Sequence, residues 1–222
     1  MRSRSVITML ALTILLLSPT QAQVPSTDAR LLKPVGNIEL RGTLVPDVCI
    51  RLAAIAGVPV AVESLDDVSF WGPTSGTKGT RVDLEVAPAA TIASVLDAAV
   101  AADPRYEWRF TGQWLHVMPR NRAAGYPLDL PCTGTLPAGS RVGPVIRSLT
   151  GSYLPESWQV QFVLRRNYPP ITRLEEVAAP PTLTLREAID VVLWRAGVQF
   201  WGTRPVHDTS VPSVSTVLEI VL

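Results

Sequence analysis

The sequence predicts an α+β fold of two small tandem domains, each with about two helices packed on small mixed sheets. A ten-residue pattern occurs twice, at 91–100 and at 184–193, and the two copies align without a gap and keep Thr and Asp at matching positions. Their apolar residues recur at helical spacing, and short alternating segments flank both copies. A repeat of this kind indicates one structural unit that is present twice.

The first 22 residues have the features of a secretory signal peptide. Arg2 and Arg4 precede an apolar run from Val6 to Leu17, and small residues surround Ala22. Because these 12 apolar residues are too few to span a bilayer comfortably, we expect cleavage after Ala22 and a mature protein without a membrane span. An uncleaved anchor is the alternative.

The composition gives no reason to expect nucleic acid or anionic lipid as a partner. The expected signal peptide holds two of the 20 basic side chains and none of the 19 acidic ones, so the remainder has a formal charge of −1 and no basic block. The remaining 200 residues suit one large or two small domains. The 20 prolines exceed the average share of about 5% and predict short elements joined by rigid turns.

The first domain is expected at 37–119, after a linker at 23–36. Its first helix has one apolar face, made of Val45, Val48, Cys49, Leu52 and Ala56. A second helix begins after Thr91, whose side chain can cap it. Strands are expected at 37–41, 58–62, 81–86, 106–110 and 114–118. Pro59 favours an edge position for the second of these strands.

The second domain is expected at 127–222, after a linker at 120–126, as a more degenerate copy of the first. Its first helix has a short apolar face, made of Val142, Val145, Ile146 and Leu149. Its second helix begins after Thr184, where Glu187 completes a capping box. Strands are expected at 126–130, 159–164, 174–177, 198–201 and 216–222.

These segments together resemble the short N-terminal domain (STN domain) shared by secretins and signalling TonB-dependent receptors. The resemblance rests on Ile38-Glu-Leu40, Leu52-Ala-Ala-Ile-Ala-Gly57, Val82-Asp-Leu-Glu-Val86, 91–100 and Trp114-Leu-His-Val117, and it extends loosely over 127–222. In that family the domain is a periplasmic docking module, which implies an envelope protein, such as an outer-membrane channel or receptor, as the partner here. No pore or barrel segment follows in this sequence, so the resemblance implies docking and not transport.

Cys49 and Cys132 both lie in the part expected to be exported, where oxidising conditions permit a disulfide. A bridge between them would tie the two domains together. The alternative is that Cys49, on the apolar face of its helix, is a buried free thiol.

Two tryptophans and two aspartates are candidates for a partner surface. Trp71 precedes a turn-forming loop at 72–80, and Trp194 lies off the main apolar stripe of its helix. Exposed Trp is enriched at interfaces. Asp97 and Asp190 are equivalent in the two copies and are expected on the solvent side of their helices. The alternatives are that Trp194 covers its own sheet and that both carboxylates are merely solvated.

No catalytic, cofactor or metal site is expected. His116 and His207 have no carboxylate or Cys cluster at ligand spacing, no Ser lies in a GxSxG turn, and the loop at 72–80 lacks the order of a phosphate-binding loop. We therefore expect a protein that is not an enzyme and needs no cofactor.

Two classes of function remain. The first is a non-catalytic periplasmic interaction module of an envelope secretion or signalling assembly, either free, associated with the outer membrane or released. The second is a periplasmic protein that binds a small ligand or cell-wall fragment in the cleft between the two domains. An exposed sheet edge favours the first class, and a pocket with converging polar groups favours the second. The oligomeric state stays open.

Overall fold

The computed structural model describes residues 28–66, 79–133, 135–136, 142–163, 177–178, 183–207 and 214–221. The expected signal peptide and Trp71 lie outside these residues. The described helices are α1 (Val45–Ala56), α2 (Ile92–Ala102), α3 (Val142–Gly151) and α4 (Leu185–Arg195). The strands of the first half are β1 (Leu40–Leu44), β2 (Val60–Glu63), β3 (Arg81–Leu84), β4 (Tyr106–Phe110) and β5 (Leu115–Pro119). Those of the second half are β6 (Thr135–Leu136), β7 (Trp158–Val163), β8 (Val177–Ala178), β9 (Phe200–His207) and β10 (Val214–Val221).

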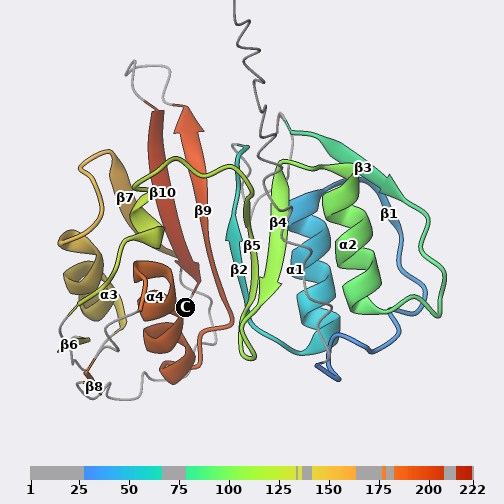
Figure 1. Ribbon diagram of the computed structural model, residues 1–222, viewed down its shortest axis with the longest axis horizontal. Coiled ribbons are helices and arrows are strands. Elements are labelled where there is room, and N and C mark those ends of the chain that lie inside the picture. Colours follow the sequence, from blue (N-terminus) through green and yellow to red (C-terminus); the bar gives the residue numbers. More distant parts are fainter. Residues whose placement is uncertain are drawn as a thin grey trace, which may run out of the picture.

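The fold is α+β, and one six-stranded sheet with the order β4-β5-β2-β9-β10-β7 runs through its centre (Figure 1). The first half of the chain supplies β4-β5-β2, and the second half supplies β9-β10-β7. In the first half β4 and β5 form an antiparallel hairpin, and β5 pairs in parallel with β2. In the second half β9 and β10 form the same hairpin, and β10 pairs in parallel with β7. The two halves therefore repeat one topology, and β2 and β9 join them by parallel pairing.

Each half also has a short antiparallel ribbon, β1 with β3 in the first and β6 with β8 in the second. An isolated bridge precedes the second helix in both halves, between Pro34 and Thr91 and between Pro131 and Thr184. The order strand, helix, strand, then strand, helix, strand, strand thus occurs twice, as the sequence repeat predicts.

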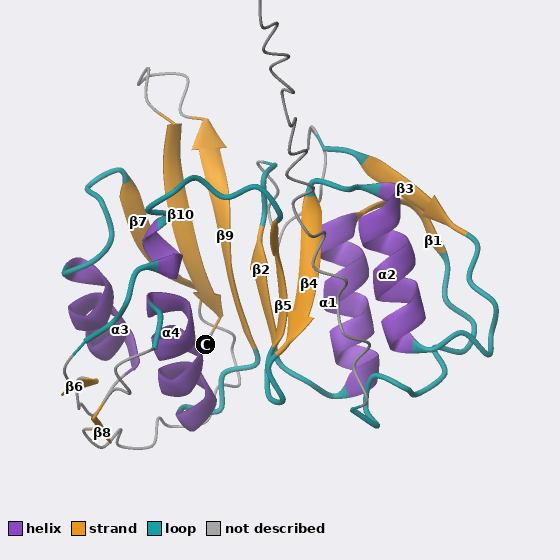
Figure 2. Cartoon of the chain, in the orientation of Figure 1, coloured by secondary structure: helices purple, strands orange, loops and turns teal. Residues whose placement is uncertain are grey.

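The two helix pairs cover opposite faces of the central sheet (Figure 2). Side chains alternate between the faces of a strand, so their core assignments identify the faces. Val60 and Val62 of β2 belong to the core around α1 and α2, whereas Ala61 belongs to the core around α3 and α4. Phe200 and Trp201 of β9 divide between the two cores in the same way.

The helices begin and end where the local chemistry requires. The Thr184 side chain accepts a hydrogen bond from the Glu187 amide, and the Glu187 carboxylate accepts one from the Thr184 amide, which completes the predicted capping box of α4. Thr91 caps α2 by accepting from the Ser94 amide. Gly57 ends α1 with φ 72°, a left-handed conformation that glycine adopts without steric cost.

Two strand predictions are wrong. The edge position predicted from Pro59 is not observed, because Pro59 precedes β2 and β2 lies between β5 and β9. The strand predicted at 126–130 is instead a short 3-10 turn at Pro127–Asp129, and the second half opens with β6. The Asp129 side chain bonds both Arg122 of the linker and Arg186 of α4, and these two contacts fix this turn.

The disulfide considered between Cys49 and Cys132 is absent, and both thiols are free and buried. Cys49 lies in the core around α1 and α2, whereas Cys132 lies in the core on the opposite face of the sheet. The alternative of a buried free thiol at Cys49 is therefore the observed one. Burial raises the pKa of the Cys49 thiol, so little of the reactive thiolate forms at neutral pH.

We expect the native protein to be inert to a thiol reagent such as Ellman's reagent, because neither sulfur is accessible. After denaturation without a reductant, both thiols per chain should react. A denatured protein with no titratable thiol, and with faster migration on non-reducing electrophoresis, would contradict the free pair.

Candidate functional site

A buried ion pair crosses the junction between the halves. Arg186 of α4 is 2% exposed and its guanidinium donates to both carboxylate oxygens of Glu63, which is 1% exposed at the end of β2. The Arg186 Nε to Glu63 Oε1 distance is 2.5 Å. Burial acts to lower the pKa of Arg186, but the Glu63 and Asp129 carboxylates outweigh it and raise that pKa. Arg186 therefore stays charged and holds the halves together.

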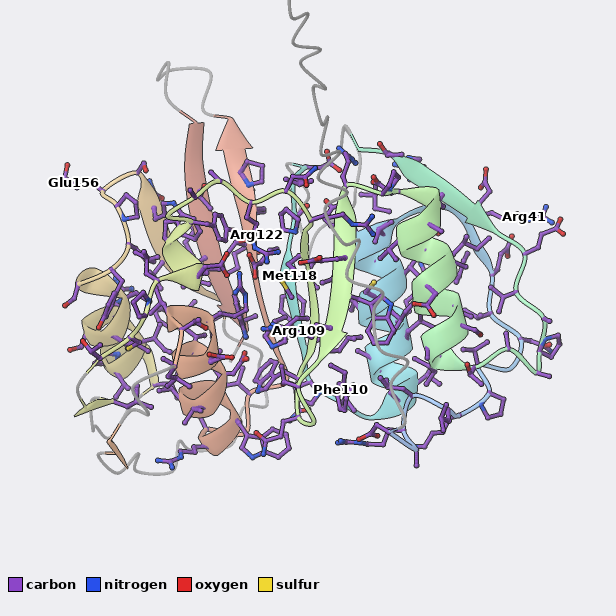
Figure 3. The ribbon with its side chains drawn as sticks, in the orientation of Figure 1. Arg41, Arg109, Phe110, Met118, Arg122 and Glu156 are labelled. Carbon is purple, nitrogen blue, oxygen red and sulfur yellow. The ribbon has the colours of Figure 1, made fainter. Side chains whose placement is uncertain are left out.

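The linker between the halves is part of the same network. Asp129 accepts from Arg186 and, at 2.9 Å, from Arg122 Nε. Arg122 also donates to Glu107 of β4 at 2.9 Å, so the network ends in the first half again. Figure 3 places Arg122 in the middle of the molecule, between the two helix pairs. Burial acts to raise the pKa of Asp129, but its bonds to Arg186 and Arg122 prevail and lower it.

A second buried contact between the halves involves two of the residues singled out in the sequence. His116 of β5 lies with its Nε2 atom 2.8 Å from Asp190 Oδ2 on α4. Trp201 of β9 donates from Nε1 to Asp190 Oδ1 at 2.9 Å. Burial raises the pKa of Asp190, and His116 acts against this rise. His116 thus takes part in a buried contact between the two halves.

The prediction of a solvent-exposed Asp190 is wrong, whereas Asp97 is exposed as expected. Both aspartates accept from the indole of the equivalent tryptophan, Trp108 for Asp97 and Trp201 for Asp190, at 2.9 Å. The difference arises because His116 from the other half covers Asp190. Asp190 is therefore removed from the candidate partner surface.

The contacts described so far give this network a structural role. Its charged members pair with one another, and across the described ranges no three His, Cys, Asp or Glu side chains gather as metal ligands would. The network holds the two halves together through paired charges.

The end of the central sheet at β7 is the candidate site. Among the described residues β7 pairs only with β10, so no described strand lies along its other edge. Thr216 donates to the carbonyl of Ser157, and amides alternate in direction along a strand. The amides of Val160 and Phe162 therefore face the open edge. The side chains of Gln159 and Gln161 are exposed on the face away from α3.

The two ends of the sheet differ in charge. β7 reads Trp-Gln-Val-Gln-Phe-Val and has neither a charged residue nor a proline. β4, at the other end, has Glu107 and exposed Arg109, and Figure 3 shows Arg109 on the central side of the first half. Charges, prolines and bulges are the usual protection of an edge strand against pairing with another chain. β7 lacks these protections.

Trp194 is 41% exposed on α4, as the sequence suggested. The sequence pattern did not identify β7 as an open edge, because a strand's neighbours are not encoded locally. The uncharged alternation of Gln with apolar residues is the signal that could have indicated it.

Comparisons of the chain with protein-family models, with curated proteins and with solved structures find no match. Within the parts of the chain that are described, no helix has the length and apolar character needed to cross a membrane.

We expect Arg186→Met to lower the free energy of unfolding by about 3–5 kcal/mol, because it leaves the Glu63 charge buried without a partner. Adding Glu63→Gln should recover most of this loss, since no unpaired charge remains. Arg30→Met, which breaks the more exposed pair with Asp28, should cost at most about 1 kcal/mol and serves as the control. Urea titration followed by tryptophan fluorescence measures all three. If the loss in the free energy of unfolding of the double variant equalled the sum of the losses of the two single variants, the proposed pairing of Arg186 with Glu63 would be contradicted.

Asp190→Ala and Asp97→Ala form a second matched pair. The first change leaves the buried donors of Trp201 and His116 unpaired and should cost about 2–4 kcal/mol, whereas water can replace the exposed Asp97 and limit its loss to about 1 kcal/mol. Equal losses in thermal or urea unfolding would show that the contact between the halves adds nothing at Asp190.

Proposed function

We propose that this chain is an exported, non-catalytic interaction module of the cell envelope, and that it docks a partner protein by strand addition at β7. The proposal joins two expectations from the sequence, a signal peptide at 1–22 and a resemblance to the STN docking domain, with the open edge described above. The edge is the observation that carries the proposal.

Strand addition requires backbone groups that are available along an accessible edge. The outward amides and carbonyls of Val160 and Phe162 supply them. Gln159 and Gln161 are exposed beside them and add hydrogen-bonding groups without a charge that would repel a partner. An uncharged six-residue edge with no proline is rarely left open without a use, since it also invites aggregation.

The alternative of a ligand in the cleft between the halves has less support. The contact region between the halves contains buried Arg186, Trp114 and Trp201, and Asp129 bonds Arg186 there. These side chains occupy the space in which that function requires a ligand.

We expect a photo-reactive amino acid in place of Gln161 to cross-link, in cells, to a discrete envelope protein such as an outer-membrane channel or receptor. The same amino acid in place of Gln113, exposed in the β4–β5 hairpin, is the control and should not capture that protein. Mass spectrometry of the adduct identifies the partner.

Val160→Pro removes the outward amide without removing a bond to β10, so it should abolish the cross-link while the protein stays folded by circular dichroism. Val160→Ala keeps the amide and should retain the cross-link. Equal capture from positions 161 and 113, or capture that survives Val160→Pro, would refute docking at β7.

A further inference from the structure

The junction between the two halves shows which strand pairs with the edge of β2, the strand in the first half that corresponds to β7. β9 runs parallel to β2, with Phe200 beside Val60 and Gly202 beside Val62. Val60 donates to the carbonyl of Gln199 at 3.0 Å, so its amide faces β9. Within this chain, one unit therefore already adds its strand to the sheet edge of the other.

β7 is the counterpart of β2 in the repeat, and the residues can be matched through the equivalent tryptophans. Trp108 pairs across its hairpin with Val117, whose parallel neighbour is Val62. Trp201 likewise pairs with Ile220, whose parallel neighbour is Phe162. Phe162 is thus the counterpart of Val62, and Val160 is the counterpart of Val60. The residues whose amides face β9 in the first half face the open edge in the second.

The exposed face of β7 follows the same correspondence. Ala61 of β2 is buried under the second half, next to Trp201. Its counterpart Gln161 points to the same relative side of β7 and is exposed. What covers this side of β2 is the next unit along the chain. The side of β7 that stays uncovered is therefore the side on which a further unit would place its helices.

We propose that β7 accepts a strand of the β9 type, which runs parallel to β7 and belongs to a unit of the same strand-helix-strand, strand-helix-strand-strand topology in another protein. This inference rests on the proposed function and deepens it by naming the kind of partner. The partner's helices cover Gln159 and Gln161, as the second half covers Ala61.

The register of the junction defines the side chains that the incoming strand needs. The position of Phe200 lies beside Val160 and faces α3, so it requires an apolar residue; in the chain itself Phe200 is 6% exposed beside Val60. The position of Gly202 lies beside Phe162, which is larger than Val62. The Phe162 ring is stacked under Arg147 of α3, at 5.2 Å from its guanidinium carbon, so it stays beside the edge. A small residue therefore fits this position.

A second copy of this chain does not meet these requirements. Its strand equivalent to β9 is β4, in which Glu107 and Arg109 occupy the positions of Phe200 and Gly202. Docking in this register would bring both charges against the α3 face and would remove Glu107 from its bond with Arg122. The two charges thus permit docking of a foreign unit while they prevent chains from polymerising end to end.

A fluorescent peptide with the sequence of residues 198–204 is the probe, and binding to the full mature chain is measured by anisotropy. The control peptide has Glu and Arg, the β4 residues, at the positions of Phe200 and Gly202. We expect the control to bind at least about ten-fold more weakly. The Val160→Pro chain should bind neither peptide, and the Val160→Ala chain should still prefer the first. A photo-reactive group at the Phe200 position should label the Val160 region if the strand is parallel.

The outcomes separate this inference from the proposed function. Capture of a partner from Gln161 in cells, with equal or no binding of the two peptides, would leave docking at β7 intact and overturn the β9-type strand. If the two peptides bind with different affinities but no partner is captured from Gln161 in cells, the preference for a β9-type strand stands and the proposed docking of an envelope protein at β7 is overturned. Binding that appears only after deletion of 164–176 would assign the edge to a segment of this chain and overturn the inference, as would end-to-end association of the wild-type protein on gel filtration.

Discussion

The parallel pairing of β2 with β9 is the contact on which the rest of the structure depends. It converts two three-stranded sheets into one sheet and places the helix pairs on opposite faces. The pairing is also specific in register, because a shift of β2 by one residue would turn Glu63 away from Arg186 and onto the apolar face packed by α1 and α2. A buried ion pair contributes little net stability against an apolar substitute, but it strongly penalises arrangements in which its partners separate.

Most of the elements could be predicted from the sequence because their signals are local. The apolar face that includes Cys49 and Leu52 predicted α1, and the cap of Thr184 with Glu187 predicted the start of α4. Helical periodicity and capping depend on residues within a few turns, so each can be read from a short window. The repeat then carried the order of elements from one half to the other.

The errors concern contacts between segments far apart in the chain. Asp190 has the same local surroundings as Asp97, yet His116 of the other half covers it, and no local pattern contains that contact. The turn at 127–129 is likewise fixed by Arg122 and by Arg186, which is distant in sequence. The candidate site at β7 was missed for the same reason, since an open edge is defined by which strands pair. The repeat is informative where the surroundings of the two copies differ: β2 shows the neighbouring strand that its counterpart β7 lacks among the described residues.

The linker takes part in the ion-pair network, so the molecule resists bending between its two halves. Many two-unit proteins bend about a flexible connection, but here the connecting segment is bonded to β4 through Arg122 and to α4 through Asp129. Opening the halves would require these charges to separate, and no disulfide joins the halves to guide reclosure. Tension applied at β7 would therefore pass through β10, β9 and β2 to the opposite end of the sheet, and the molecule would transmit load across its paired strands rather than yield at its middle.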